Sequence, residues 1–239
     1  MAAVVTKQLL EQTIECPCCK NEFKTWKIRA RAVKLIKRDT DFRGIYEGQN
    51  PVYYGIYVCP HCGYAAFEAD YFKINPNEIK EVRKQISCKW KSRDYGNLRN
   101  AKDAITTYKL ALVSYTILGW RQSQIGKICL RLAWLHRDID EKVERTYMEH
   151  AINCFEKAFS TEPLDENPEE ELMTLYLLGE LNRRIGQYNK AVQWFGKALA
   201  CPFIKKRRQI ELKARDQLQA TSDAYRAERA KAKAEEEAK

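Results

Sequence analysis

Two short cysteine pairs constrain this chain more than any other feature of its sequence. They read Cys16-Pro17-Cys18-Cys19 and Cys59-Pro60-His61-Cys62-Gly63. The C-x-x-C spacing lets two thiolates from one tight turn reach the same metal ion, and two such pairs supply the four soft ligands of a tetrahedral zinc site. We therefore predict that one structural Zn2+ ion is bound by Cys16, Cys19, Cys59 and Cys62. Four thiolates leave no open coordination position, so this ion would stabilise the fold and would not catalyse.

Other chemistry is compatible with the same residue types. An iron–sulfur cluster also uses four thiolates, and a C-x-x-C pair can serve disulfide exchange, although two matched pairs argue against exchange. Within the first pair, Cys18 could replace Cys16 as a ligand, but the C-x-x-C spacing favours Cys16 with Cys19. Lys20 stands where the second pair has Gly63, so the first turn is expected to be the less regular of the two.

The segments around the cysteine pairs alternate between apolar and polar residues, as half-buried strands do. Residues 23–35 place Trp26, Ile28, Ala30 and Ala32 on one face, with basic residues between them. Residues 51–58 alternate in the same way and end directly before Cys59. Strands that lead into cysteine turns are typical of zinc ribbons, so we predict a small β zinc-ribbon-like domain over residues 1–75.

After residue 75 the pattern becomes helical. Asn75-Pro76-Asn77-Glu78 and Asn167-Pro168-Glu169-Glu170 each combine an N-cap residue, a proline at the first helical position and acidic residues in the first turn. A domain boundary is therefore predicted near residue 75. The predicted helices cover residues 77–91, 99–117, 121–138, 142–160, 168–185, 188–200 and 204–230.

One part of the helical region follows the tetratricopeptide pattern of small residues at helix contacts and larger residues between them. Its best copy contains Gly179, Tyr188, Ala191, Phe195 and Ala198. Two weaker copies carry Leu132, Ala133, Ala151, Phe155 and Ala158, and then Ala104, Tyr108 and Ala111. The predicted fold class is thus mostly α, with a tetratricopeptide-like helical hairpin stack over residues 76–203 and a charged C-terminal helix and tail over 204–239. A generic helical bundle is the alternative.

Composition narrows the functional classes. The formal net charge is +10, which favours acidic partners, but the basic residues are spread thinly along the chain. No apolar run reaches the length of a membrane span, and the scattered cysteines suit a reducing compartment, so a cytoplasmic location is expected.

Asp39 and Asp41 could form an acidic metal pair, but turn residues that bond nearby amides are the simpler interpretation. No catalytic motif is present, so we do not expect an enzyme.

The stretch from Arg38 to Tyr71 resembles a family of bacterial proteins, the domain-of-unknown-function 2225 family. The resemblance is carried by Arg38-Asp39-Thr40-Asp41-Phe42, Tyr46, Asn50-Pro51 and Tyr54, and by Val58-Cys59-Pro60-His61-Cys62-Gly63-Tyr64-Ala65-Ala66-Phe67. The first cysteine pair and the helical repeats are similar to that family as well. The resemblance implies a cytoplasmic bacterial protein with a zinc-binding head and a tetratricopeptide-like body, and it implies no settled activity.

Two functions are compatible with these features. The first is an adaptor that binds a protein or peptide partner in the concave groove of the helical stack. Its expected contact residues are Tyr176, Glu180, Arg183, Trp134 and Arg137. The alternative is RNA or single-strand nucleic-acid binding by the basic zinc-ribbon head. The expected contact residues for that function are Lys27, Arg29, Arg31, Lys34, Tyr53 and Tyr57.

Overall fold

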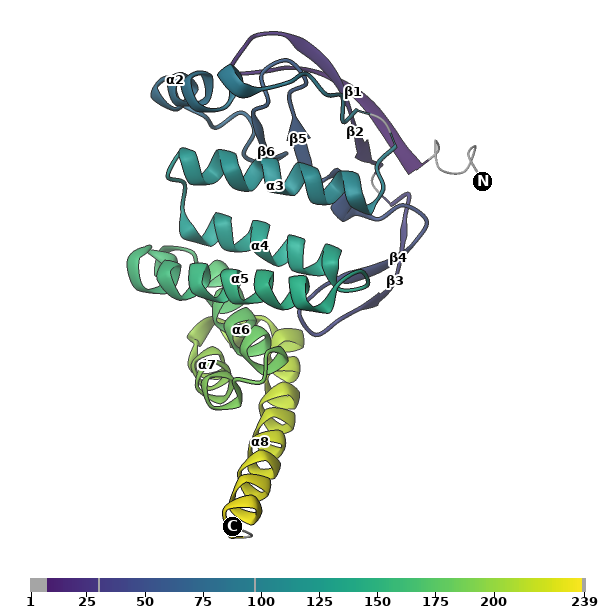
Figure 1. The fold of residues 1–239 in the computed structure, drawn as a ribbon. Coiled ribbons are helices and arrows are strands. Elements are labelled where there is room, and N and C mark those ends of the chain that lie inside the picture. The colour runs from purple at the N-terminus through teal and green to yellow at the C-terminus, as the bar shows by residue number, and fades with distance from the viewer. Residues whose placement is uncertain (1–7, 30, 97, 238–239) are drawn as a thin grey trace. The chain divides into compact units, whose positions relative to one another are not determined.

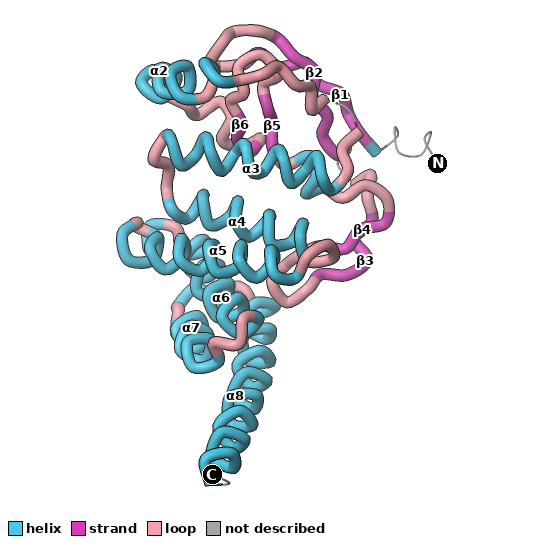
Figure 2. The backbone as a smooth tube through the Cα atoms, viewed as in Figure 1, coloured by secondary structure: helices cyan, strands magenta, loops and turns pink. Residues whose placement is uncertain are grey.

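The computed structural model describes residues 8–29, 31–96 and 98–237. Its contacts divide the chain into two compact units, Met1–Tyr147 and Met148–Lys239. The predicted fold class is confirmed, because helices dominate the chain and small antiparallel sheets lie near the N-terminus (Figures 1 and 2). Ala30, in a predicted strand, and the last two residues of the predicted tail lie outside the described residues.

The helices follow the predicted ranges closely. They are α2 (Pro76–Gln85), α3 (Ala101–Ile117), α4 (Gln122–His136), α5 (Glu141–Thr161), α6 (Pro168–Arg184), α7 (Tyr188–Ala200) and α8 (Arg208–Glu237). The capping signal at Asn75 is real, since its side chain accepts hydrogen bonds from the amides of Asn77 and Glu78. The helix predicted over 77–91 ends early at Gln85 and continues as the short 3-10 helix η2 (Ser87–Lys89).

The strands differ more from the expectation. They form three two-stranded antiparallel sheets, which pair β1 (Leu9–Glu15) with β2 (Glu22–Ile28), β3 (Lys34–Arg38) with β4 (Gly44–Glu47), and β5 (Ile56–Val58) with β6 (Ala65–Phe67). The single strand predicted over residues 23–35 is wrong. It is interrupted before β3, where Arg31 adopts a positive φ of 61°. Strand β1 was not predicted, because polar residues occupy most of its length.

The strand predicted over residues 51–58 is only half correct. Pro51–Tyr54 form the 3-10 helix η1, and only Ile56–Val58 are extended. Asn50 explains the difference, because its side chain accepts a hydrogen bond from the amide of Val52 at 3.0 Å, and Pro51 fixes φ at the first helical position.

The first unit joins the sheets to helices of the following region. The backbone amide of Ala65 donates to Ser114 Oγ at 3.3 Å, and that of Phe67 donates to the Tyr115 hydroxyl at 3.2 Å. Helix α3 therefore packs against the hairpin of β5 and β6. The compact units accordingly divide the chain at a different place from the boundary predicted near residue 75.

In the second unit, helices α6 and α7 form a close hairpin. Gly179 on α6 faces the fully buried Phe195 on α7, and a Cβ at Gly179 would lie 2.6 Å from the Phe195 ring. This contact is the one that the tetratricopeptide pattern predicts for a small residue at position 179. The other 3-10 helices of this unit are η3 (Leu164–Glu166) and η4 (Pro202–Lys206).

Replacing Gly179 with alanine should destabilise the second unit by about 1–2 kcal/mol, because overpacking a tight core outweighs the helix propensity that alanine adds. Gly196→Ala is the matched control, since nothing lies within 4 Å of a Cβ at that helical position. It should stabilise by about 0.5–1 kcal/mol. Urea denaturation of both variants measures the difference, and equal midpoints would contradict the close contact.

Candidate metal centre

Each cysteine pair lies in a turn between the two strands of a hairpin. The first turn joins β1 to β2, and the second joins β5 to β6. In the first turn, the Cys16 amide donates to Asn21 O at 3.0 Å and the Lys20 amide donates to Cys16 O at 2.9 Å. The second turn repeats both bonds, from the Cys59 amide to Tyr64 O and from the Gly63 amide to Cys59 O, each at 2.9 Å. The two turns therefore share one hydrogen-bond pattern.

The expected irregularity of the first turn is wrong. Lys20 has a φ of 66° and Gly63 has a φ of 77°, so both occupy the left-handed region and both turns close in the same way. The difference between them is energetic. Glycine adopts this conformation without steric cost, whereas lysine must accommodate its Cβ.

Lys20→Gly should consequently stabilise the first turn. We expect a gain of about 0.5–1 kcal/mol, because strain at Cβ is relieved and only an exposed ion pair with Glu15 is lost. Thermal unfolding of the metal-loaded chain measures this gain.

Gly63→Ala is the opposite test. It should destabilise the chain, since φ is positive and a Cβ would lie 2.6 Å from the Trp90 ring.

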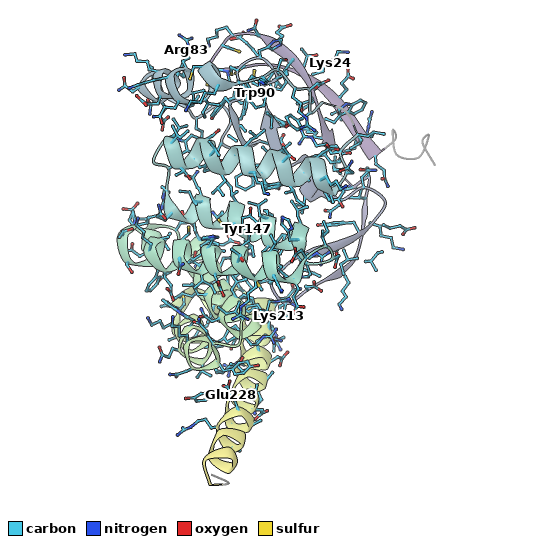
Figure 3. All side chains as sticks on the ribbon, in the orientation of Figure 1. Lys24, Arg83, Trp90, Tyr147, Lys213 and Glu228 are labelled. Carbon is cyan, nitrogen blue, oxygen red and sulfur yellow. The ribbon has the colours of Figure 1, made fainter. Side chains whose placement is uncertain are left out.

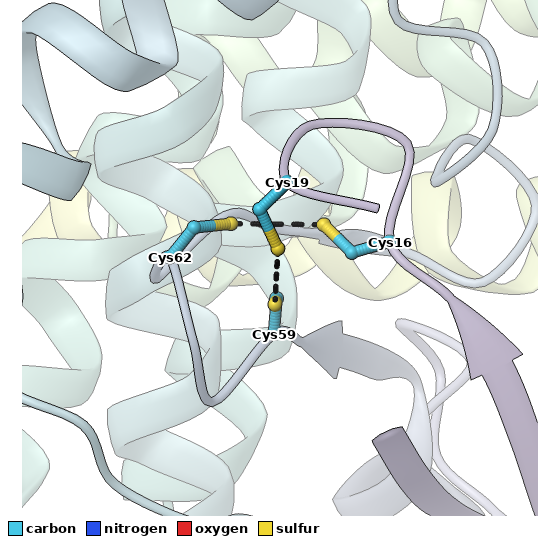
Figure 4. A group of neighbouring side chains, drawn as sticks. All are labelled: Cys16, Cys19, Cys59 and Cys62. Atoms are coloured by element: carbon cyan, nitrogen blue, oxygen red, sulfur yellow. Dashed lines mark hydrogen bonds between the residues drawn. The ribbon is translucent and has the colours of Figure 1, made fainter. Parts of the chain in front are cut away.

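The two turns bring four sulfur atoms together. The Sγ atoms of Cys16, Cys19, Cys59 and Cys62 all lie within 4.8 Å of one another (Figure 4). Cys16 lies 3.6 Å from Cys62, and Cys19 lies 3.6 Å from Cys59. A tetrahedron with metal–sulfur bonds of about 2.3 Å has edges of about 3.8 Å, so this arrangement fits a single tetrahedral ion. Cys18 is buried but is not part of this group, which includes Cys16.

Side chains from the segment after the second turn hold the backbone of both turns. Arg83 donates from Nε and Nη2 to the Cys18 carbonyl at 3.2 and 2.8 Å. Trp90 donates from Nε1 to the Pro60 carbonyl at 2.8 Å, and Ser87 donates to the Cys62 carbonyl at 3.0 Å. Arg83 and Trp90 are labelled in Figure 3. Sequence reasoning missed these residues, since nothing in their local pattern distinguishes them from other polar or aromatic residues of a helix.

Tyr71 is a fully buried aromatic residue close to the cysteine group. Burial raises the pKa of its hydroxyl, and the negative charge of Cys16 raises it further. The hydroxyl therefore stays protonated, and within the described part of the chain it has no hydrogen-bond partner. Tyr64 holds Tyr71 in place by donating to its carbonyl at 3.3 Å.

The residues predicted to contact a partner in the groove lie mostly inside the protein. Tyr176 and Glu180 are fully buried. Tyr176 packs edge-on against Phe195, and Glu180 pairs with Arg183 and Arg184 at 2.8 and 2.7 Å. The tetratricopeptide pattern predicted that Tyr176 and Glu180 lie on the groove side of α6. In the structure their side chains instead form contacts inside the protein. Arg183 is the more exposed member of the α6 set.

Trp134 and Arg137 also have internal partners. Arg137 contacts Asp39 at 2.9 Å and Glu144 at 2.6 Å, and it pairs with the fully buried Asp41. Trp134 donates from Nε1 to Asp41 at 2.9 Å. We call Asp39, Asp41, Arg137 and Glu144 the Arg137 cluster. Asp41 also accepts a hydrogen bond from the Arg43 amide, as expected of a turn residue, but its ion pair with Arg137 was not predicted.

Only some of the residues predicted to contact nucleic acid have side chains that are exposed to solvent. Tyr57 is buried and its hydroxyl donates to Gln12, so its ring cannot stack on a base. Arg29 donates to the Leu9 carbonyl. Lys27 and Lys34 form exposed ion pairs with Glu68 and Glu47, respectively. Tyr53 is partly exposed and Arg31 is exposed.

We expect His136 to make the stability of the first unit depend on pH. Neither ring nitrogen has a hydrogen-bond partner among the described residues, and the ring stacks on Tyr147. Burial lowers its pKa below the ordinary 6.5, and Lys109 lowers it further while Asp140 opposes the shift. A lowered histidine pKa contributes stability that is present above the unfolded-state pKa, near 6.5, and is lost as pH falls through the folded-state value.

We therefore expect the midpoint temperature of thermal unfolding to decrease as the pH is lowered from 7 to 5.5. In His136→Gln this decrease should be smaller. His150→Gln, which alters an exposed histidine, is the control and should leave the change as it is. An unaltered pH profile in His136→Gln would contradict the assignment.

Comparisons with known proteins agree with the resemblance noted from the sequence. Residues 9–221 match the family described as "Uncharacterized protein conserved in bacteria (DUF2225)". A curated protein of Borreliella burgdorferi (strain B31), named only as an uncharacterized protein, is 30% identical over an alignment of 151 residues, and the match covers 55% of this chain and 54% of that relative. The alignment thus spans about half the length of the curated relative. No solved structure matches the chain. In the described part of the chain, no helix has the length and apolar content to cross a bilayer.

Proposed function

This chain belongs to the DUF2225 family of bacterial proteins, and we propose that it is a zinc-stabilised, helical-repeat adaptor for a protein or peptide partner. The four-sulfur group is the observation that carries the proposal. Four thiolates saturate a tetrahedral ion and leave no position for substrate or water, which favours a scaffolding role.

Zinc is the metal that we propose for this site. Four thiolates in a tetrahedral arrangement suit zinc, and the ion needs no further ligand from the protein or from solvent. In a closed site of this kind the metal links the two hairpins, so the energy of metal binding contributes directly to folding.

The remaining polar groups support a binding role over a catalytic one. Among the described residues, the four cysteines are the only close group of three or more potential metal ligands. The buried carboxylates of Asp41 and Glu180 are paired with arginines, so neither is a free acid or base. We propose that the helical hairpins present the partner-binding surface, with Arg183 as the accessible member of the predicted groove set. The cytoplasmic location stays a prediction.

Two measurements on the full chain test this function. Elemental analysis of protein purified without added metal should give one zinc per chain. Crosslinking mass spectrometry in the native cell should then recover reproducible protein partners, and these crosslinks should be lost when Cys59 and Cys62 are both changed to serine. RNA recovered in place of protein, with affinity that falls steeply with salt, would support the nucleic-acid alternative and contradict the adaptor. An exchangeable water on the metal would also contradict it.

A further inference from the structure

Strand β3 has an edge that no described strand covers. It pairs with β4 on one side only, in a two-stranded sheet. All five of its residues are exposed. Unpaired backbone donors and acceptors along such an edge can form hydrogen bonds with an added strand.

The hairpin of β3 and β4 also exposes aliphatic side chains. Ile36 is 62% exposed, Leu35 is 42% exposed and Ile45 is 39% exposed. Exposed large apolar side chains are typical of interaction surfaces. The register pairs Leu35 with Tyr46 and Ile45 with Lys37, so Leu35 and Ile45 lie on opposite faces of the hairpin. Ile36 lies at a bulge, where the pairing with β4 shifts between Leu35 and Lys37.

Contacts near both ends of the hairpin hold it in place. At the turn, the Arg137 cluster fixes Asp39 and Asp41, and Arg43 forms an ion pair with Asp138. At the other end, the Gln49 amide donates to Gln8 Oε1 at 3.0 Å. A two-stranded hairpin is only marginally stable alone. Here its ends are fixed while β3 stays exposed, so a partner that binds the edge would have little ordering cost.

The charge on this edge is strongly positive. Residues 31–38 contain Arg31, Lys34, Lys37 and Arg38 and no acidic residue. Of these, Lys34 has an acidic neighbour across the sheet, and its 3.7 Å contact with Glu47 is exposed. An exposed pair of this kind contributes little and is easily replaced.

We propose that the free edge of β3 binds an extended, acidic segment of a partner protein, which adds to the hairpin as a third strand. This proposal rests on the adaptor function and names the surface and the chemistry of the partner. Acidic side chains of the segment pair with the basic residues of β3, and its aliphatic residues cover Leu35 and Ile36. Main-chain hydrogen bonds supply affinity, and alternate side chains supply specificity.

Charge and composition exclude the other occupants of this edge. A second copy of β3 would place lysine and arginine opposite like charges, and the bulge further disfavours self-pairing. Nucleic acid would suit the charge, but single strands also need exposed aromatic rings for stacking. The aromatic residue within these strands, Tyr46, is half-buried, and the exposed apolar residues are aliphatic.

Fluorescence anisotropy with the metal-loaded full chain tests the proposal. The probe is a labelled peptide of four Glu-Val repeats, compared with a peptide of four Lys-Val repeats and with an oligouridine of ten nucleotides. We expect the acidic peptide to bind and the basic peptide and RNA to bind at least tenfold more weakly. Ile36→Asp and the double change Lys37→Glu with Arg38→Glu should each weaken acidic-peptide binding at least tenfold. Leu212→Asp and Lys205→Glu make matched changes on exposed positions elsewhere and should leave it unchanged.

Each other result overturns the strand proposal. Acidic-peptide binding that survives both hairpin variants would place the site elsewhere, and equal binding to RNA would indicate a general polyanion surface. Absence of acidic-peptide binding at millimolar peptide would remove the site altogether. Zinc content and circular dichroism of the variants show that each remains folded. The adaptor function is judged separately, because protein partners crosslinked at sites outside residues 34–47 would support it while this proposal failed.

Discussion

The double variant Cys59→Ser with Cys62→Ser should fail to fold its N-terminal hairpins and should bind no zinc. The two turns contact each other through the four sulfurs, and removing one pair leaves two ligands for an ion that needs four. Structural zinc sites contribute about 10 kcal/mol or more to folding, which is as large as the whole stability of a typical domain. Near-ultraviolet circular dichroism and elemental analysis should show both losses together.

A strong chelator should unfold the same region in the unmodified protein, and added zinc should restore it. Cys88→Ser is the matched control, since Cys88 is an exposed cysteine outside the group. It should keep both its zinc and its unfolding midpoint. A double variant that loses zinc but keeps its midpoint would show that the metal does not stabilise the fold.

Arg137→Met should destabilise the first unit by about 3–5 kcal/mol, because it leaves the buried Asp41 carboxylate without its counter-charge. Burial alone would lower the pKa of Arg137, but hydrogen bonds to Asp41 and Glu144 outweigh it and raise the pKa above the ordinary value. The guanidinium therefore stays charged in the cluster. Chemical denaturation of the zinc-loaded chain measures the loss.

Two further variants separate the charge effect from lost packing. Adding Asp41→Asn to Arg137→Met should recover part of the stability, since a neutral amide is less costly to bury than an unpaired carboxylate. Arg215→Met removes an exposed ion pair with Glu211 on α8 and should change stability by less than about 1 kcal/mol. Equal effects of Arg137→Met and Arg215→Met would contradict the importance of the Arg137 cluster.

The Arg137 cluster also connects stability with the proposed binding edge. It holds the turn between β3 and β4, so its loss should release the hairpin even where the zinc site is intact. Arg137→Met is thus expected to weaken acidic-peptide binding without touching the peptide. The proposed zinc site and the Arg137 cluster act on different parts of the first unit, one through the cysteine turns and the other through the β3–β4 turn.

The group of four cysteines and most helices could be predicted because their signals are local. Cysteine spacing places two sulfurs on one turn, and the cap at Asn75 with Pro76 marks a helix start within four residues. Gly179 was identified from the spacing of small residues, and its contact with Phe195 bears this out. The strands were harder, since β1 has few apolar residues and alternation alone could not separate β2 from β3.

The sequence alone was thus sufficient to identify Cys16, Cys19, Cys59 and Cys62 as a group, because each C-x-x-C pair shows both the type of ligand and its spacing within four residues. The partners of Arg137 could not be predicted from local sequence. Asp39 lies 98 residues from Arg137, and a charged residue in a helix has the same appearance in sequence whether it faces water or a buried carboxylate. Folding brings Asp39, Asp41 and Glu144 to one guanidinium, and it turned expected contact residues such as Glu180 into buried ion pairs.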